Sequence, residues 1–282
     1  MKTTYVVYLL FAVVFGTLLF HIWSPWWFTP LASNWSSIDF AILVTFWVTG
    51  FVFLALGGFM VYCVWKYRHQ RNRKAEYKPE DKKLEFILVL VSAIAVVVLL
   101  APGLSVWGDY IKVPKGAVKV EVLSYQWGWN YRLAGEDGVL GTTSIHNISD
   151  ENPYGLDLND PNGKDDLMVQ DADLHLQIDK PVELLLRSID VIHNFYVPEF
   201  RAKMDMVPGL VTYYWITPTK TGEYEILCAE LCGTGHYAML GIVSVDKKSD
   251  YSNWLAQQIT FESTLAQNKI KNKTIQLAEN TK

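Results

Sequence analysis

The sequence has 282 residues and a formal net charge of −4 at pH 7, and half of its residues are hydrophobic. The small acidic surplus excludes a strongly basic chain, so we expect no nucleic-acid partner. The apolar residues are concentrated in the first third of the chain, and the remainder is more polar. The average composition therefore combines two different regions.

Three apolar segments, residues 5–24, 40–65 and 86–107, contain no Asp, Glu, Lys or Arg. A helix of about 20 residues, rising ~1.5 Å per residue, crosses about 30 Å of hydrocarbon. Aromatic residues gather at the ends of these segments, as in WSPWWF (23–28) and VWKY (64–67), which is typical of membrane interfaces. We therefore predict a membrane anchor over residues 1–110 with three transmembrane helices, in preference to a buried soluble bundle.

Charged residues in the loops predict the orientation of the anchor. The loop over residues 66–83 carries eight Lys or Arg, whereas residues 24–37 carry none, so the basic loop is expected to stay in the cytoplasm. The first segment resembles a secretory signal, but its apolar run is long and no small-residue cleavage site follows directly, so we expect a retained helix. We predict a multi-pass protein of a bacterial-type inner (plasma) membrane, with its soluble domain on the periplasmic or outer face.

A second domain is predicted over residues 111–250, where the pattern changes to short β-branched or aromatic runs that partly alternate with polar residues. Gly, Pro, Asp and Asn separate these runs, and together they predict a small antiparallel sandwich or barrel. Residues 251–282 are expected to form one packed helix and a loose tail. The predicted strands are residues 118–123, 174–178, 182–186, 211–216, 223–227 and 241–245.

An acidic insertion interrupts this domain at residues 136–173. It contains ten Asp or Glu against a single lysine, Lys164, together with several Gly, Pro and Asn. Taken alone, such a segment favours a solvated loop over a binding surface.

The run CAELCGTGHYAM collects Cys228, Cys232, His236 and Met239 within one short loop, and His193 lies upstream in SIDVIHNFYVP. Thiolate, imidazole and thioether are ligands that favour copper or zinc. A structural zinc site would use four Cys or His and no methionine. An electron-transfer copper site uses a distant histidine with the other ligands on one loop, which is the pattern here.

Two thiolates four residues apart distinguish this loop from a site for a single copper ion, because both can bridge a pair of copper ions. The alternative is a disulfide between Cys228 and Cys232, which an oxidising compartment would favour. A disulfide leaves the spacing of His236 and Met239, and the upstream His193, without an explanation.

The same run resembles the binuclear copper (CuA) signature of subunit II of the haem-copper oxidases, Cys-x-Glu-x-Cys-x-x-x-His-x-x-Met. The resemblance extends to YQWGWNY (125–131), SIDVIHNFYVP (188–198) and AKMDMVPG (202–209), and covers about residues 40–250. It implies transmembrane helices followed by an all-β cupredoxin-like Greek-key barrel, as in cytochrome c oxidase subunit II. It also implies a binuclear copper centre with the ligands His193, Cys228, the backbone oxygen of Glu230, Cys232, His236 and Met239.

The resemblance implies further roles at single positions. The Glu230 side chain would reach a magnesium or manganese ion at the contact with subunit I, and Trp127 would accept electrons from cytochrome c. Glu85 resembles a glutamate that opens a proton channel into subunit I, although a helix N-terminus also favours an acidic residue. Lys203 and Asp205 resemble residues on an outward water path.

The function implied by the resemblance is electron transfer from cytochrome c, through the copper centre, to haems held by subunit I only, where oxygen is reduced to water and protons are pumped. The partners would be subunit I, other oxidase subunits, the lipid membrane, and a basic donor attracted by the acidic insertion and Asp190. A nitric oxide reductase with a similar copper subunit is one alternative. A membrane-anchored copper chaperone is another, but it would be expected to have a thioredoxin-like βαβ pattern and no methionine ligand.

Overall fold

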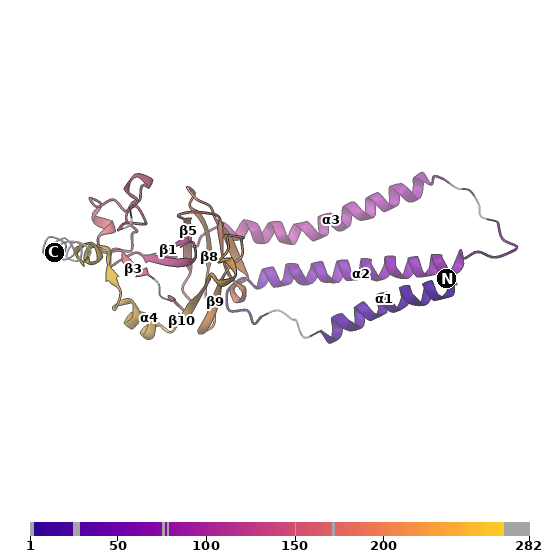
Figure 1. Ribbon diagram of the computed structural model, residues 1–282. Coiled ribbons are helices and arrows are strands. Elements are labelled where there is room, and N and C mark those ends of the chain that lie inside the picture. The colour runs from indigo at the N-terminus through magenta and orange to yellow at the C-terminus, as the bar shows by residue number, and fades with distance from the viewer. Residues whose placement is uncertain are drawn as a thin grey trace. The chain divides into compact units, whose positions relative to one another are not determined.

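The computed structural model divides the chain into an apolar helical unit and a β domain (Figure 1). Some of the predicted features lie outside the described residues: the tail beyond residue 267, residues 25–28 of the aromatic cluster, and Asp150 and Asp171 of the acidic insertion. The structure describes residues 3–24, 29–74, 77, 79–149, 151–170 and 173–267.

Three long helices make up the helical unit: α1 (Thr3–Trp23), α2 (Ser36–Lys66) and α3 (Lys82–Tyr110). All three are long and apolar enough to cross a membrane by length and composition. The helices α2 and α3 extend beyond the charge-free segments at both ends. At the start of α3, Asp81 accepts a hydrogen bond from the backbone N–H of Leu84 (3.1 Å), and such a cap lets the helix begin before its apolar segment.

Within this unit α1 approaches α2 closely at a glycine. A Cβ atom at Gly57 would stand 2.8 Å from Cγ2 of Val14, so a larger residue at position 57 would force the two helices apart. Glycine therefore permits this contact, as small residues do in packed membrane helices.

The β domain consists of two sheets, as expected from the alternating pattern. The first has the strand order β11-β3-β2-β1-β5-β8 and the second β4-β10-β9-β6-β7. The strands are β1 (Val118–Tyr125), β2 (Gly128–Leu133), β3 (Leu167–Gln170), β4 (Leu174–Gln177), β5 (Val182–Ser188), β6 (His193–Val197), β7 (Ala202–Met206), β8 (Thr212–Ile216), β9 (Gly222–Cys228), β10 (Leu240–Asp246) and β11 (Ile259–Thr260).

The expectation of a purely antiparallel domain is wrong. The strand β1 pairs with β5, and β4 pairs with β10, in parallel. Both parallel pairs join strands that are distant in sequence, so no hairpin turn links them. The inward-facing residues of the two sheets, including Val120, Val122, Phe195, Tyr214 and Ile226, are buried and form the core.

The C-terminal region also differs from the prediction. The helix α4 (Lys248–Leu255) begins earlier than expected and is followed by the short strand β11, which pairs with β3. Residues 261–267 are helical, and Phe261 is buried with Leu123 and Met168. This last described segment is therefore anchored in the domain core through Phe261.

The segment 29–36, which precedes α2, belongs to the β domain. The backbone N–H of Ala32 donates to the carbonyl of Glu199 (2.9 Å). Trp35 is buried, its ring packs on that of Trp215 at 4.9 Å, and its indole N–H donates to the carbonyl of the same residue (3.0 Å). We call residues 29–36 the strap, because they tie the chain before α2 to the β domain.

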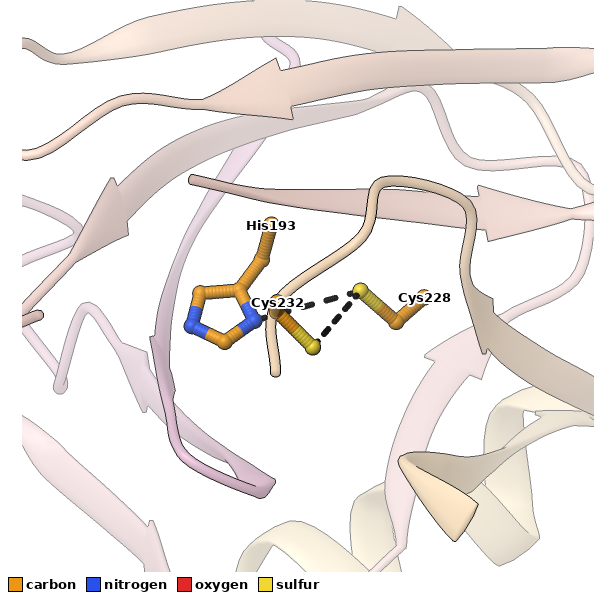
Figure 2. A group of neighbouring side chains, drawn as sticks. All are labelled: His193, Cys228 and Cys232. Carbon is orange, nitrogen blue, oxygen red and sulfur yellow. Dashed lines mark hydrogen bonds between the residues drawn. The ribbon is translucent and has the colours of Figure 1, made fainter. Parts of the chain in front are cut away.

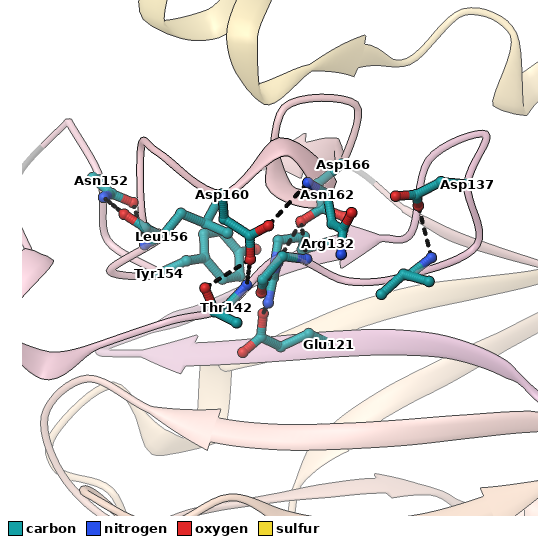
Figure 3. Close-up of polar contacts among 12 residues, drawn as sticks. Glu121, Arg132, Asp137, Thr142, Asn152, Tyr154, Leu156, Asp160, Asn162 and Asp166 are labelled. Carbon is teal, nitrogen blue, oxygen red and sulfur yellow. Dashed lines mark hydrogen bonds and ion pairs between the residues drawn. The ribbon is translucent and has the colours of Figure 1, made fainter.

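The acidic insertion follows β2 and includes β3, and it is partly packed on the sheet, which differs from the solvated loop that its composition predicts (Figure 3). The buried side chain of Arg132 pairs with the carboxylates of Glu121 and Asp166, both of which are also buried. Tyr154 and Leu156 of the insertion are fully buried in the cluster that contains Phe261. One carboxylate of the insertion, Asp166, thus holds it on the sheet through a buried ion pair.

Candidate metal centre

The predicted copper ligands come from two places in the second sheet. His193 begins β6, whereas Cys228 ends β9 and the other ligands follow on the loop to β10. The antiparallel pairing of β6 with β9 sets Phe195 opposite Cys228, and the backbone N–H of Ala229 donates to the carbonyl of Asn194 (3.2 Å). Strand pairing therefore places the distant histidine beside the loop.

The two thiols lie together and are free cysteines (Figure 2). Their sulfur atoms are 3.7 Å apart, and Nδ1 of His193 is 3.9 Å from Sγ of Cys228. The ligand atoms of His193, Cys228 and Cys232 all lie within 4.8 Å of one another, as in a group that could hold a metal ion. His193 and Cys232 are buried, so the site is shielded from bulk water.

The remaining predicted ligands surround the same sulfurs. Cys232 Sγ lies 3.6 Å from Nδ1 of His236 and 3.7 Å from Sδ of Met239, which is 1% exposed. The backbone oxygen of Glu230 is 3.2 Å from Cys228 Sγ. The loop closes on itself, because the backbone N–H of Cys228 donates to the carbonyl of Met239 (3.3 Å).

This donor set fits two copper ions better than one structural zinc ion. Two sulfurs, two imidazole nitrogens, a thioether and a backbone oxygen converge, and the thioether is a soft ligand. Without a metal, burial and the neighbouring Cys228 thiol raise the pKa of Cys232 to about 11. A metal must therefore displace a proton from this thiol, as is general for cysteine ligands.

A carboxylate fixes the orientation of His193. Oδ1 of Asp190 lies 2.8 Å from Nε2 of His193. Burial raises the pKa of Asp190, but hydrogen bonds from His193 and from the backbone N–H groups of Val191 and Gln126 outweigh it and hold that pKa below its usual range. Because an ionised carboxylate only accepts, Nε2 carries the proton and Nδ1 presents its lone pair toward Cys228.

Trp127 lies beside the same loop and is 42% exposed. Its indole N–H donates to the backbone carbonyl of Cys232 (3.3 Å), and the side-chain amide of Gln126 donates to the same oxygen (2.9 Å). The structure therefore brings Trp127 to the thiol loop. Gln126 lies in the YQWGWNY segment, but the resemblance implies a role only for its neighbour Trp127.

The remaining predicted roles fall on the side chain of Glu230 and on Glu85, Lys203 and Asp205. The Glu230 side chain is exposed, and Glu85 is exposed in the first turn of α3. Asp205 accepts a hydrogen bond from the side chain of Asn194 (2.6 Å), and Lys203 lies over the ring of Tyr196.

Comparison with known proteins identifies a matching family and two related proteins. The family described as "Cytochrome C oxidase subunit II, periplasmic domain" matches residues 118–246. The alternative cytochrome c oxidase subunit 2 of Bradyrhizobium diazoefficiens is 53% identical over 262 residues, which are 93% of this chain and 95% of that protein. The cytochrome c oxidase subunit 2 of Cereibacter sphaeroides is 27% identical over 226 residues, 75% of each chain.

Among solved structures, the periplasmic domain of subunit II of cytochrome oxidase from Bradyrhizobium japonicum is 24% identical, with a TM-score of 0.38. The match covers 51% of this chain and 95% of that one. The family match and the two-sheet domain confirm the predicted fold class, apolar helices followed by a cupredoxin-like β domain.

Proposed function

The chain belongs to the cytochrome c oxidase subunit II family, and from this premise we propose that it is the copper-containing, electron-accepting subunit of a respiratory haem-copper oxidase. In this proposal, cytochrome c or a similar basic protein delivers electrons to a binuclear copper centre. Haems in subunit I then receive the electrons, and the complex reduces oxygen to water and pumps protons.

One observation carries the proposal: every other predicted ligand atom lies close to the two free thiols. The two sulfurs are 3.7 Å apart. Four other ligand atoms each lie 3.2–3.9 Å from one of these sulfurs: Nδ1 of His193, Nδ1 of His236, Sδ of Met239 and the carbonyl oxygen of Glu230. A bound copper pair would supply one-electron redox chemistry without a change in the protein's covalent bonds. The residues of the chain would hold the ions in a nearly constant geometry and exclude water through the burial of His193, Cys232 and Met239.

Trp127 is the proposed point where electrons reach this subunit. Its ring is partly exposed, so a donor can touch it, and its indole N–H contacts the carbonyl of Cys232. The side chain thus spans the short distance between the surface and a copper-binding residue. Exposed acidic residues of the insertion, such as Glu136 and Glu151, would attract a basic donor over long range.

Two further roles extend the proposal to subunit I. The exposed Glu230 carboxylate would bind a magnesium or manganese ion at the contact with subunit I, while its backbone oxygen serves copper. Glu85 would open a proton path at the start of α3, and the three helices would hold the subunit in a bacterial inner membrane with the β domain outside.

A copper chaperone with a thioredoxin-like fold is not favoured by the topology. From β1 to β10 the described residues contain strands and short 3₁₀ turns but no α-helix, whereas that fold requires βαβ units. The relatives described above are named as cytochrome c oxidase subunits, which favours an oxidase over a nitric oxide reductase.

The proposal is tested by the copper content and electron paramagnetic resonance spectrum of the full-length chain in detergent. We expect two copper ions per chain sharing one unpaired electron. Cys228→Ser and Cys232→Ser should each abolish this signal, whereas Cys63→Ser, which changes a thiol on α2 outside the site, should retain it. A wild-type chain that binds no copper, or a signal that survives both serine variants, would contradict the proposal.

A further inference from the structure

Asp190 joins two segments that are distant in sequence. One carboxylate oxygen, Oδ1, accepts from Nε2 of His193 (2.8 Å), and the other, Oδ2, accepts from the backbone N–H of Gln126 (2.7 Å). The His193 side chain is fully buried, whereas that of Asp190 is 27% exposed. A single carboxylate at the edge of the site therefore connects the metal-binding histidine to the segment that carries Trp127.

Gln126 extends this connection to a third segment. Its backbone N–H is held by Asp190, and its side-chain amide donates to the carbonyl of Cys232 at 2.9 Å. Trp127, the next residue, donates its indole N–H to the same carbonyl. One oxygen of the thiol loop thus receives two donors from adjacent residues, which restrains both the loop and the indole.

From these contacts we infer that Asp190 and Gln126 are positioning residues, a clamp that holds His193, Trp127 and the thiol loop in one fixed arrangement. The inference rests on the proposed copper function, and it identifies the residues that hold the proposed ligands in place. Asp190 selects the imidazole tautomer with Nδ1 free for metal, and Gln126 fixes the indole against Cys232. Carboxylates that orient metal-binding histidines contribute about 10–100-fold to metal affinity.

A role in positioning differs measurably from a role in docking. If Asp190 served only as a surface charge that attracts a basic donor, its removal would change the association rate and its salt dependence. The copper centre would then be unchanged in the absence of any donor. If Asp190 orients His193, its removal must alter the copper centre itself.

The experiment compares Asp190→Ala, Asp190→Asn and Gln126→Ala with the wild type, all as full-length chains loaded with copper and without donor. Glu225→Gln, which neutralises an exposed carboxylate on β9, is the matched control. The readouts are the visible and paramagnetic resonance spectra, the midpoint potential, and copper retention against a chelator. We expect Asp190→Ala to shift the spectrum and potential and to lower copper affinity about 10–100-fold, and Glu225→Gln to match the wild type.

Asp190→Asn and Gln126→Ala keep the inference testable if Asp190→Ala does not fold. The amide oxygen of Asp190→Asn can still accept from His193, but its amide nitrogen cannot accept from Gln126, so we expect a smaller shift. Gln126→Ala should keep both copper ions and, in a separate measurement with a cytochrome donor, be reduced more slowly than the wild type. Wild-type spectra, potential and copper retention in all folded Asp190 variants would refute the clamp, whereas a wild-type chain without copper would refute the proposed function instead.

Discussion

The indole of Trp127 lies directly on the backbone of Gly235, the residue before His236. A Cβ atom at position 235 would stand 2.8 Å from Cε2 and from Cε3 of this ring, closer than atoms of neighbouring side chains pack. The loop therefore admits the indole only because position 235 has no side chain.

We predict that Gly235→Ala displaces Trp127 and slows reduction of the copper centre by a cytochrome donor. Moving the indole away from the Cys232 carbonyl weakens the contact between the donor surface and the copper centre, so the rate should fall. Rapid-mixing measurement of copper reduction, after copper content has been matched to the wild type, gives the rate. Thr234→Ala is the control, since Thr234 is an exposed neighbour, and an unchanged rate in Gly235→Ala would show that the indole contact is not needed.

The strap supplies a second prediction, about stability. Trp35 is 3% exposed and packs on Tyr110 as well as Trp215. Replacing a buried Trp by Ala typically costs about 3–5 kcal/mol, so Trp35→Ala should lower the thermal unfolding temperature of the β domain in the detergent-solubilised chain. Trp35→Phe keeps a ring and loses the hydrogen bond, so its effect should be smaller. Equal unfolding temperatures for Trp35→Ala and the wild type would show that the strap is not structural.

The proximity of Cys228, Cys232, His236 and Met239, the proposed ligands on one loop, could be predicted from the sequence because they lie within twelve residues and their spacing is specific. The groups that hold those ligands could not, because their contacts are long-range. Gln126 and Cys232 are 106 positions apart, and no local pattern predicts which carbonyl an amide will reach. Asp190 stands three residues before His193, and its charge alone predicts only a part in the surface that attracts a basic donor.

A similar limit applies to the strands. The predicted strands alternate or are strongly apolar, whereas β7 carries Lys203 and Asp205, and β2 begins at Gly128 and contains Asn130 and Arg132. In the insertion, acidic composition predicts exposure, but the partner of Asp166 is Arg132 on β2. Charge counted along the sequence does not distinguish paired from solvated carboxylates.

The buried pairs of Arg132 give a third prediction. Arg132→Met would leave the buried carboxylates of Glu121 and Asp166 without this cation, although Glu121 keeps its contact with Arg187 (2.7 Å). Breaking a buried pair by removing one partner typically costs about 3–5 kcal/mol. We expect a lower unfolding temperature and faster proteolysis within residues 136–166. The control Lys164→Met removes an exposed cation and should change neither the unfolding temperature nor the proteolysis rate. If Arg132→Met were cleaved at the wild-type rate, the ion pairs would not be what holds the insertion on the sheet.

The last prediction concerns the attraction of a basic donor by the insertion. Glu136 and Glu151 are exposed, and steering by opposite charge raises encounter rates by ~10–10³. The double variant Glu136→Gln and Glu151→Gln should therefore lower the association rate at low salt. It should also make this rate less dependent on ionic strength. Lys164→Gln removes the only lysine of the insertion and should act in the opposite direction. Stopped-flow reduction by a basic cytochrome across a salt series measures both effects. Since long-range attraction depends on net charge rather than on contact, equal rates for these variants at low salt would place the docking surface elsewhere on the domain.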